Sequence, residues 1–249
     1  MLQLDHLSYS VGEDNHRKTI IDDLNLTVDD GKFVVVTGPN GGGKSTLAKL
    51  IMGVYPATSG RILLDGTDIT DLGITERARA GISFAFQQPV HFKGIRVIDL
   101  LRLAVGKHIS LNEACEYLSN VGLCAKEYID REVNNSLSGG ELKRIEIATV
   151  IARGTKFAIF DEPEAGIDIW SFQNLIHVFE NVRERIKGTV LIISHQERIL
   201  NIADDILVIE AGKIKQYGPK DEILPALLGT ASATASSCSK LAEGGIQHA

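Results

Sequence analysis

The fold of this chain is decided by one stretch near its N-terminus, Phe33-Val34-Val35-Val36-Thr37-Gly38-Pro39-Asn40-Gly41-Gly42-Gly43-Lys44-Ser45-Thr46. Its apolar first residues predict a buried strand, and the residues from Lys44 onward predict a helix. Between them lies a glycine-rich turn ending in Lys-Ser, which is the spacing and context of a phosphate-binding loop. A chance glycine-rich turn is the alternative, but it does not explain why strand, Lys-Ser pair and helix stand in register.

The chemistry of such a loop gives its residues separate roles. Glycines let successive backbone N–H groups point at a phosphate, Lys44 reaches the β- and γ-phosphate oxygens, and the Ser45 hydroxyl ligates Mg²⁺. We therefore expect ATP and Mg²⁺ to bind here. The residues expected to contact the nucleotide are Gly38, Asn40, Gly41, Gly43, Lys44, Ser45 and Thr46.

The rest of the chain alternates between strand-like and helix-like segments. Apolar runs without strict alternation predict buried parallel strands at 32–37, 156–160, 189–194 and 205–210. Helical patterns follow at 44–52, 140–153, 169–186 and 196–203. This order predicts an α/β fold with helices on both sides of a mainly parallel sheet.

Three regions depart from that alternation. Residues 1–30 and 59–70 alternate and contain turns, which predicts a small antiparallel sheet near the N-terminus. Helical periodicity predicts a helical lobe inserted at about 90–135. We expect one domain over 1–225 and a flexible C-terminal tail over 226–249, where small and polar residues dominate.

Composition excludes several classes of function. The net charge of −6 and the pI near 5.7 argue against a nucleic-acid partner. The sequence contains no run of about 18 apolar residues, so we expect no membrane-spanning helix. The N-terminus lacks the charged and apolar regions of a signal peptide. The cysteines, Cys115, Cys124 and Cys238, have no metal-ligand spacing and fit a reducing cytoplasm.

A second glycine-rich motif, Leu137-Ser138-Gly139-Gly140-Glu141, opens the predicted helix at 140–153. The hydroxyl of Ser138 and the backbone N–H groups of Gly139 and Gly140 offer another phosphate-binding site. One nucleotide is not easily held by two such sites of the same chain. We therefore expect Ser138, Gly139 and Gly140 to bind a nucleotide held by a second copy.

An apolar strand delivers two carboxylates, Asp161 and Glu162, to the edge at which the phosphate loop is expected. There Asp161 holds the metal, and Glu162 faces the γ-phosphate and polarises an attacking water. An acidic strand end that caps a helix is the alternative. The phosphate loop on the same edge favours the catalytic interpretation.

Three single residues complete the expected site, each with a plainer alternative. His195 ends a strand on the same edge and is expected to reach the γ-phosphate or Glu162, although strand-end histidines are more often structural. Gln87 borders the lobe and is expected to touch Mg²⁺ or water, although it is otherwise an ordinary loop glutamine. Tyr9 is expected to stack on adenine, with core packing nearly as good an explanation.

With these motifs in this order, the chain resembles an ATP-binding-cassette (ABC) ATPase over roughly residues 1–220. The resemblance makes Gly38–Thr46 the Walker A loop, Gln87 the Q-loop, Leu137–Glu141 the signature, and Asp161 and Glu162 the end of Walker B. It adds a D-loop with Asp168, and it makes His195 the switch histidine. It implies the P-loop NTPase fold of ABC proteins and a head-to-tail dimer that sandwiches and hydrolyses two ATP molecules.

Within that family, local stretches are similar to SufC, the soluble ATPase of iron–sulfur cluster assembly. They are residues 76–90, Glu141 with Lys143 and Arg144, 166–169 and 195–200. This similarity implies a SufB-like soluble scaffold as partner and a cytoplasmic location. Pro163 and the short segment 54–60 depart from it. The alternative is the ATP-binding subunit of a membrane transporter, peripheral to the inner membrane, with permease subunits as partners.

Overall fold

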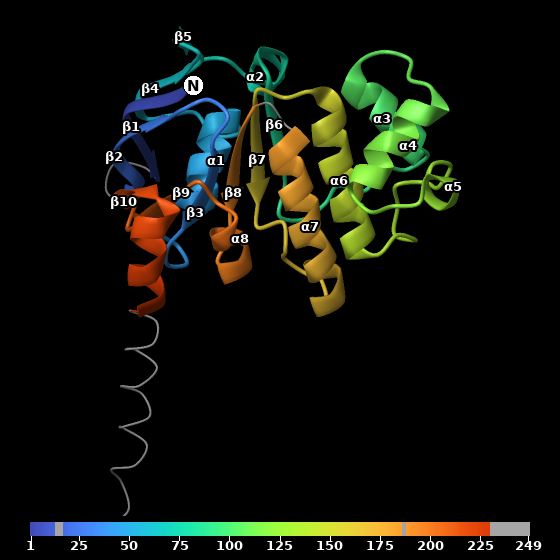
Figure 1. Cartoon of the computed structure of the whole chain (residues 1–249). Coiled ribbons are helices and arrows are strands. Elements are labelled where there is room, and N and C mark those ends of the chain that lie inside the picture. Colours follow the sequence, from blue (N-terminus) through green and yellow to red (C-terminus); the bar gives the residue numbers. More distant parts are fainter. Residues whose placement is uncertain (13–16, 186–187, 230–249) are drawn as a thin grey trace, which may run out of the picture.

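The computed structural model describes residues 1–12, 17–185 and 188–229, which form two sheets and the helices that cover them (Figure 1). The strands are β1 (Leu2–Val11), β2 (Lys18–Val28), β3 (Phe33–Thr37), β4 (Ser59–Leu64), β5 (Thr67–Asp68), β6 (Ile82–Ala85), β7 (Phe157–Asp161), β8 (Thr189–Ile193), β9 (Asp205–Glu210) and β10 (Lys213–Pro219). The helices are α1 (Lys44–Met52), α2 (Ile74–Ala80), α3 (Val97–Val105), α4 (Leu111–Asn120), α5 (Ala125–Tyr128), α6 (Gly139–Arg153), α7 (Ile169–Arg185) and α8 (Glu197–Asn201).

The larger sheet has the order β10-β9-β3-β8-β7-β6, and every pairing in it is parallel except that of β10 with β9. Its central strands are buried on both faces. In β3, Val34 and Val36 pack with α1 and the smaller sheet, whereas Phe33 and Val35 pack against the helices of the other face. Burial on both sides explains why these strands read as continuous apolar runs, and the predicted α/β fold is confirmed.

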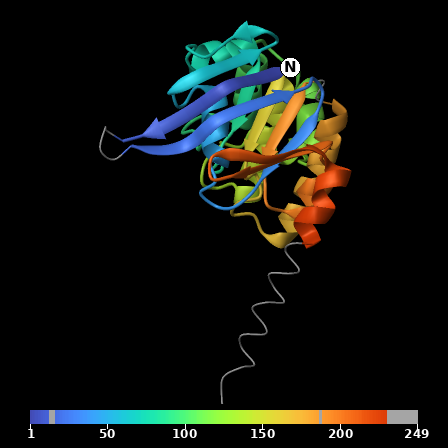
Figure 2. The same ribbon diagram turned by 90° about the vertical axis from the view of Figure 1, so that its left-hand side faces the viewer.

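The smaller sheet is antiparallel, with the order β2-β1-β4-β5, as the patterns at 1–30 and 59–70 predicted. Its β1–β2 hairpin projects from the body of the molecule (Figure 2). One face of the hairpin packs into the core through the buried side chains of Leu2, Leu4, Leu7 and Ile21. The smaller sheet therefore lies on the α1 side of the larger one and brings β2 to the phosphate loop.

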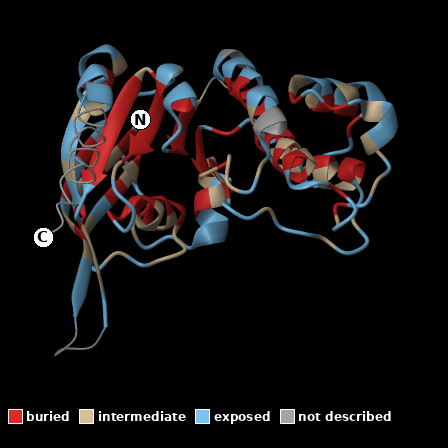
Figure 3. Ribbon diagram, turned by 90° about the horizontal axis from the view of Figure 1, so that it is seen from below, coloured by how far each residue is buried: buried red, intermediate tan, exposed pale blue. Residues whose placement is uncertain are grey.

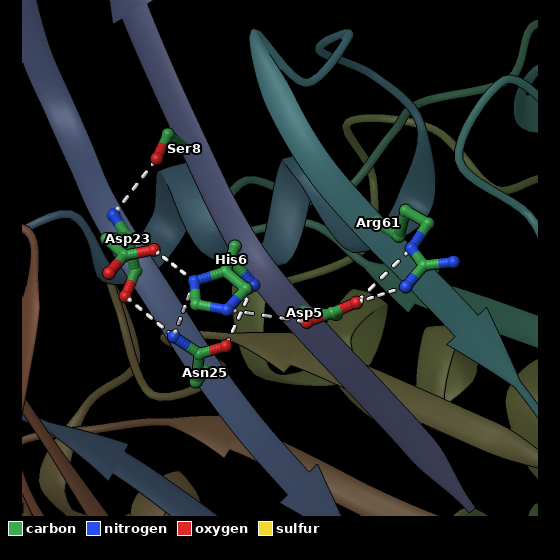
Figure 4. A network of polar contacts seen from close by, with 6 residues as sticks. All are labelled: Asp5, His6, Ser8, Asp23, Asn25 and Arg61. Carbon is green, nitrogen blue, oxygen red and sulfur yellow. Dashed lines mark hydrogen bonds and ion pairs between the residues drawn. The ribbon is translucent and has the colours of Figure 1, made fainter.

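The hairpin contains a strained polar cluster (Figure 4). His6 and Asp23 have φ values of 50° and 54°, a left-handed conformation that is uncommon for non-glycine residues, at a register shift between β1 and β2. The His6 Nδ1 atom lies 2.7 Å from Asp23 Oδ1, and the backbone N–H of His6 donates to Asn25. The hydrogen bond to Asp23 raises the pKa of the exposed His6 ring.

The predicted lobe is present as α3, α4 and α5, which pack on α6 (Figure 1). Ser110 and Glu113 form a reciprocal cap at the start of α4. Buried residues fill the strands and the inward faces of the helices (Figure 3), and one apolar cluster runs from the sheet through α6 into the lobe. The lobe is thus held by a core that it shares with α6.

Some elements differ from the predictions. The strands β6 and β10 and the helix α2 were not predicted. Residues 220–229 form a helix in which Ile223 and Leu224 are buried, and the predicted domain boundary at 225 falls inside this helix. Residues 230–249 of the predicted tail lie outside the described residues. Within the part of the chain that the structure describes, no helix is long and apolar enough to cross a membrane.

A buried cation ties the phosphate-loop helix to its neighbours. Arg77 of α2 is only 1% exposed, and its guanidinium donates to the carbonyls of Leu50, Ile51, Thr70 and Leu72. Leu50 and Ile51 belong to the last turn of α1, where a cation also complements the helix dipole. Arg77 therefore satisfies carbonyl groups that would otherwise be buried without partners.

We expect Arg77→Met to lower the free energy of unfolding by about 2–4 kcal/mol, because it leaves several buried carbonyls without a charged donor. Arg79→Met is the matched control, since Arg79 lies on the same helix and is exposed. Urea unfolding of both variants measures the difference. Equal midpoints for the two variants would contradict the structural role of Arg77.

Candidate nucleotide-binding and catalytic site

The phosphate loop depends on glycine at two positions where other backbone packs against it. A Cβ atom at Gly38, which has a φ of +131°, would lie 2.0 Å from the carbonyl oxygen of Ile209 on β9. At Gly43, with a φ of +107°, it would lie 3.0 Å from the carbonyl oxygen of Ile20 on β2. Neighbouring strands therefore close around the loop and set its shape. The Lys44 ammonium lies inside the loop and donates to the carbonyls of Gly38 and Pro39 at 2.8 and 2.9 Å.

A cavity of about 570 Å³ opens above this loop. Its lining comes from the loop, from Gln87 and Glu162, and from Lys18 and Ile20 of β2. Of the predicted phosphate-loop residues, all except Gly38 line this cavity. The lining residues are Lys18, Ile20, Asn40, Gly41, Gly42, Gly43, Lys44, Ser45, Thr46, Gln87 and Glu162.

Two of the three residues predicted to hold Mg²⁺, Ser45 and Asp161, meet at the start of α1. The Ser45 hydroxyl donates to Asp161 Oδ1 at 2.9 Å, so the end of β7 and the first turn of α1 meet. Asp161 is buried, and burial raises the pKa of its carboxyl group. A hydroxyl, a carboxylate and the amide oxygen of Gln87 are the hard oxygen donors that Mg²⁺ prefers, so these residues fit the ion.

Glu162, the predicted base, occupies a strained backbone position. Its φ is 43°, a conformation that costs a non-glycine residue about 1–3 kcal/mol and is enriched at active sites. The Gln87 side-chain amide donates to Glu162 Oε2 at 2.6 Å, and His195 Nε2 lies 4.0 Å from Oε1. The three predicted residues Gln87, Glu162 and His195 therefore meet, and Gln87 and Glu162 line the cavity.

Burial and neighbouring charges shift the pKa values of the titratable groups in this site. Burial lowers the pKa of His195, and the nearby Lys44 ammonium lowers it further, against an opposing effect of Glu162. Burial also lowers the pKa of Lys44. At neutral pH the His195 ring is therefore mainly neutral, so one of its nitrogens accepts a hydrogen bond while the other donates.

The Ser138–Gly140 motif lies at the first turn of α6 and does not line the phosphate-loop cavity. Ser138 caps the helix reciprocally with Glu141, whose carboxylate accepts from the Ser138 N–H at 2.7 Å. The Tyr128 hydroxyl also donates to Glu141. Gly139 instead lines a separate cavity of about 530 Å³ together with Gln87 and Gly166.

A buried ion pair on α6 was missed by the sequence analysis. The side chain of Lys143 is 2% exposed and lies 3.1 Å from Glu146, whose pKa is raised by burial. Lys143 donates to the Phe86 carbonyl, and Glu146 accepts from the Phe86 N–H at 3.1 Å. The pair therefore holds the residue directly before Gln87. The three-residue spacing of Lys143 and Glu146 in the predicted helix was the pattern from which the pair could have been predicted.

Two other predicted residues lie outside the cavity lining. Tyr9 stacks on Tyr55, with ring centroids 5.3 Å apart, and packs against the core. Asp168 lies just before α7, where its carbonyl accepts from the N–H of Phe172. Close by, Glu164 accepts a 2.5 Å hydrogen bond from Ser194, which ties this loop to the residue before His195.

Comparison with known proteins agrees with the geometry of this site. A family model described as "ABC transporter" matches residues 21–165, more than half of the chain. The chain is an ABC ATPase. ABC ATPases bind ATP with Mg²⁺ and hydrolyse it, which agrees with the phosphate loop, the Ser45–Asp161 pair and Glu162.

Several relatives are similar to this ABC ATPase along most of its length. An uncharacterized ABC transporter ATP-binding protein of Methanocaldococcus jannaschii is 42% identical over 83% of this chain and 85% of its own. A probable ABC transporter ATP-binding protein of Streptococcus pyogenes is 36% identical over 88% of each chain. A probable ATP-dependent transporter, ycf16, of Pyropia yezoensis is 34% identical over 88% and 91%.

Solved structures share the fold. A dimeric ATP-binding cassette bound to ADP and Pi superposes with a TM-score of 0.77 at 22% identity, covering 88% of this chain and 99% of that one. The cbiO1 protein of Clostridium perfringens, described as part of an ABC transporter complex, has a TM-score of 0.74 at 26% identity and covers 90% of each chain. The predicted P-loop ABC fold is confirmed.

We expect His195 to titrate below its ordinary pKa of about 6.5 and His6 to titrate above it, because Lys44 and burial oppose the charge on His195 whereas Asp23 favours that on His6. NMR titration of the ring carbons measures both in one sample. In Lys44→Met the His195 value should rise and the His6 value should stay. An unchanged His195 value in Lys44→Met would contradict the effect of Lys44.

Proposed function

We propose that this ABC ATPase works as a head-to-tail dimer, in which Ser138, Gly139 and Gly140 of one copy contact the ATP held in the phosphate loop of the other. The observation that supports this is the separation of the two phosphate-binding motifs. The loop at Gly38–Thr46 lines one cavity, and Gly139 lines another. Asp168, in the loop beside Gly139, would lie at the same dimer interface.

Hydrolysis would use the residues that meet at Glu162. Glu162 accepts a proton from the attacking water, and Gln87 holds the carboxylate in place through its 2.6 Å hydrogen bond. His195 and Lys44 stabilise the charge on the γ-phosphate oxygens. Mg²⁺, held by Ser45, Asp161 and Gln87, would neutralise charge on the phosphates.

We expect Glu162→Gln to lower kcat by at least 100-fold and still to bind ATP, because it removes the proton acceptor and keeps the size of the side chain. This variant should elute as a dimer with ATP and as a monomer without it. Adding Ser138→Arg should abolish the ATP-dependent dimer and leave ATP binding intact. An ATP-dependent dimer in the double variant would contradict the assignment of Ser138 to the partner's nucleotide.

A second surface supports a partner that receives the motion. An apolar groove of about 200 Å³ lies between the segment after β6 and the helices α3 and α6. Phe86 and Val90 are 40% and 48% exposed on its wall, and Phe92, Leu100 and Leu142 line it further. Exposed apolar side chains gathered in one groove are typical of a protein-binding site.

We propose that permease subunits of a membrane transporter occupy this groove. The names of the similar proteins support this partner, since they describe ATP-binding proteins of ABC transporters and a transporter complex. They do not single out the SufC-like alternative with its SufB-like scaffold. That alternative keeps the local sequence similarities in its support, among them the acidic residue Glu141 in the fifth position of the motif.

We expect Phe86→Ser to weaken retention of the partner at least tenfold, because the change removes an aromatic anchor from the groove. Leu103→Ser is the matched control, since Leu103 is 68% exposed on α3 and lies outside the groove lining. Affinity purification from native cells measures both. If a polytopic membrane protein co-purifies with Leu103→Ser and not with Phe86→Ser, the permease is supported. If a soluble scaffold behaves in this way instead, the SufC-like alternative replaces the permease proposal. Equal retention by both variants would rule out the groove.

A further inference from the structure

Glu164 is a half-buried acidic residue that the proposed hydrolysis does not use. It lies two residues after Glu162, in the loop that joins β7 to α7. Its Oε2 atom is buried and has no hydrogen-bond partner among the described residues. Burial raises the pKa of its carboxyl group, against the hydrogen bond that it accepts from Ser194. Because a buried polar atom without a partner destabilises a fold, its presence beside a catalytic carboxylate indicates a role.

The other carboxyl oxygen of Glu164 holds a fully buried hydroxyl group. Ser194 is 0% exposed, and its hydroxyl donates to Glu164 Oε1 at 2.5 Å. The same hydroxyl accepts from the backbone N–H of Gln196 at 3.0 Å. Ser194 and Gln196 are the two neighbours of His195 in the chain. Through one hydroxyl, Glu164 therefore fixes the backbone on both sides of the histidine.

The His195 ring depends on that backbone for its position. Its Nε2 atom lies 4.0 Å from Glu162 Oε1, which is beyond hydrogen-bond distance. The side chain is also 39% exposed, so packing covers only part of it. The backbone at 194–196 therefore sets the distance between the ring and the catalytic carboxylate.

Glu164 is itself held in a turn that packs against the motif helix. Its carbonyl accepts from the Ile167 N–H at 3.2 Å. The carbonyl oxygen of Gly166, in the same turn, would lie 3.5 Å from a Cβ atom at Gly139, the first residue of α6. The carboxyl group thus joins the backbone at His195 to a loop that is anchored on α6.

We infer that Glu164 is a positioning residue of this ABC ATPase: through the Ser194 hydroxyl, its carboxyl group holds His195 at the distance from Glu162 that hydrolysis requires. The inference rests on the role proposed for His195 and adds a residue on which that role depends. A misplacement of about 1 Å in an active site can lower the rate roughly 100-fold. Glu164 does not line the phosphate-loop cavity, so its loss should lower kcat and leave ATP binding intact.

Substitutions of Glu164 separate the hydrogen bond from the rest of the side chain. Glu164→Leu removes the acceptor, and we expect it to lower the kcat for ATP at least about tenfold and to change the KM by less than about twofold. Glu164→Gln keeps an oxygen that accepts from Ser194, and its kcat should stay within about threefold of that of the unchanged chain. Steady-state hydrolysis by the full chain with Mg²⁺ measures both. Equal losses of kcat in the two variants, or no loss in Glu164→Leu, would overturn the inference.

Ser194→Ala breaks the same hydrogen bond from the other side, and it carries the test if Glu164→Leu does not fold. Its kcat should fall about as far as that of Glu164→Leu, and combining the two changes should cause no further loss, because both remove one interaction. Ser83→Ala is the matched control, since Ser83 is also buried and its hydroxyl lies 2.7 Å from that of Thr155 on the opposite side of α6 from the motif. It should lower the thermal midpoint and keep kcat. Losses that multiply in the double variant would overturn the inference.

The titration of His195 gives a readout that a loss of stability alone does not produce. Burial lowers the pKa of His195. In Glu164→Leu the released ring should titrate closer to its ordinary pKa of about 6.5, whereas in Glu164→Gln its pKa should stay unchanged. NMR of the ring carbons in the folded variants measures the shift. An unchanged pKa of His195 in Glu164→Leu would overturn the inference.

His195→Ala distinguishes this inference from the proposed function on which it rests. If His195→Ala keeps the full kcat, the role proposed for His195 in hydrolysis is wrong. If His195→Ala loses kcat and Glu164→Leu does not, that role stands and the positioning by Glu164 is wrong. A loss of kcat in both variants, with Glu164→Gln active, is the result that we expect.

Discussion

The site depends on the parallel register of β3, β8 and β7. In this register Val36 lies beside Ile193, and Ile193 lies beside Asp161. The three strands therefore end at the same level, where one continues into the phosphate loop, one into His195 and one into Glu162. The Glu162 N–H donates to the Ile193 carbonyl, and the Ser194 N–H donates to the Val36 carbonyl, which joins the strand ends directly. Because a slip of one residue would turn every side chain to the other face, the buried valines and isoleucines on both faces hold the site together.

Sequence reasoning succeeded wherever local chemistry decides the structure. The helix α1 runs from Lys44 to Met52 as predicted, because Gly43 and Gly53 in left-handed conformations begin and end it. The strands β3, β7, β8 and β9 were found because burial on both faces leaves a continuous apolar run. Most of the predicted phosphate and metal ligands also meet at one cavity, since their motifs lie at the carboxyl ends of those strands.

The features that local patterns did not indicate share a different cause, which is contact between residues distant in sequence. Nothing near Tyr9 indicates that Tyr55 will stack on its ring. The strand β6 is short, and it is recognisable only by its pairing with β7. The domain was predicted to end at 225, a position inside the helix at 220–229, whose buried residues Ile223 and Leu224 belong to a core formed by segments elsewhere in the chain. Pairings of this kind are set by tertiary packing and leave a weak pattern in the local sequence.

The segment at Phe86 and Gln87 connects three parts of the molecule that otherwise lie apart. The side chain of Phe86 lines the apolar groove, its backbone is held by the buried Lys143–Glu146 pair of α6, and the next residue donates to Glu162. A buried ion pair is costly to disrupt, because removal of one partner leaves an uncompensated charge. The pair therefore keeps this segment and α6 together when either moves. In the proposed complex, a partner that presses on Phe86 would displace Gln87 relative to Glu162. A nucleotide bound at the first turn of α6 would act on the same two residues through Lys143 and Glu146. The contacts of Phe86 and Gln87 thus connect the groove, the motif helix and Glu162.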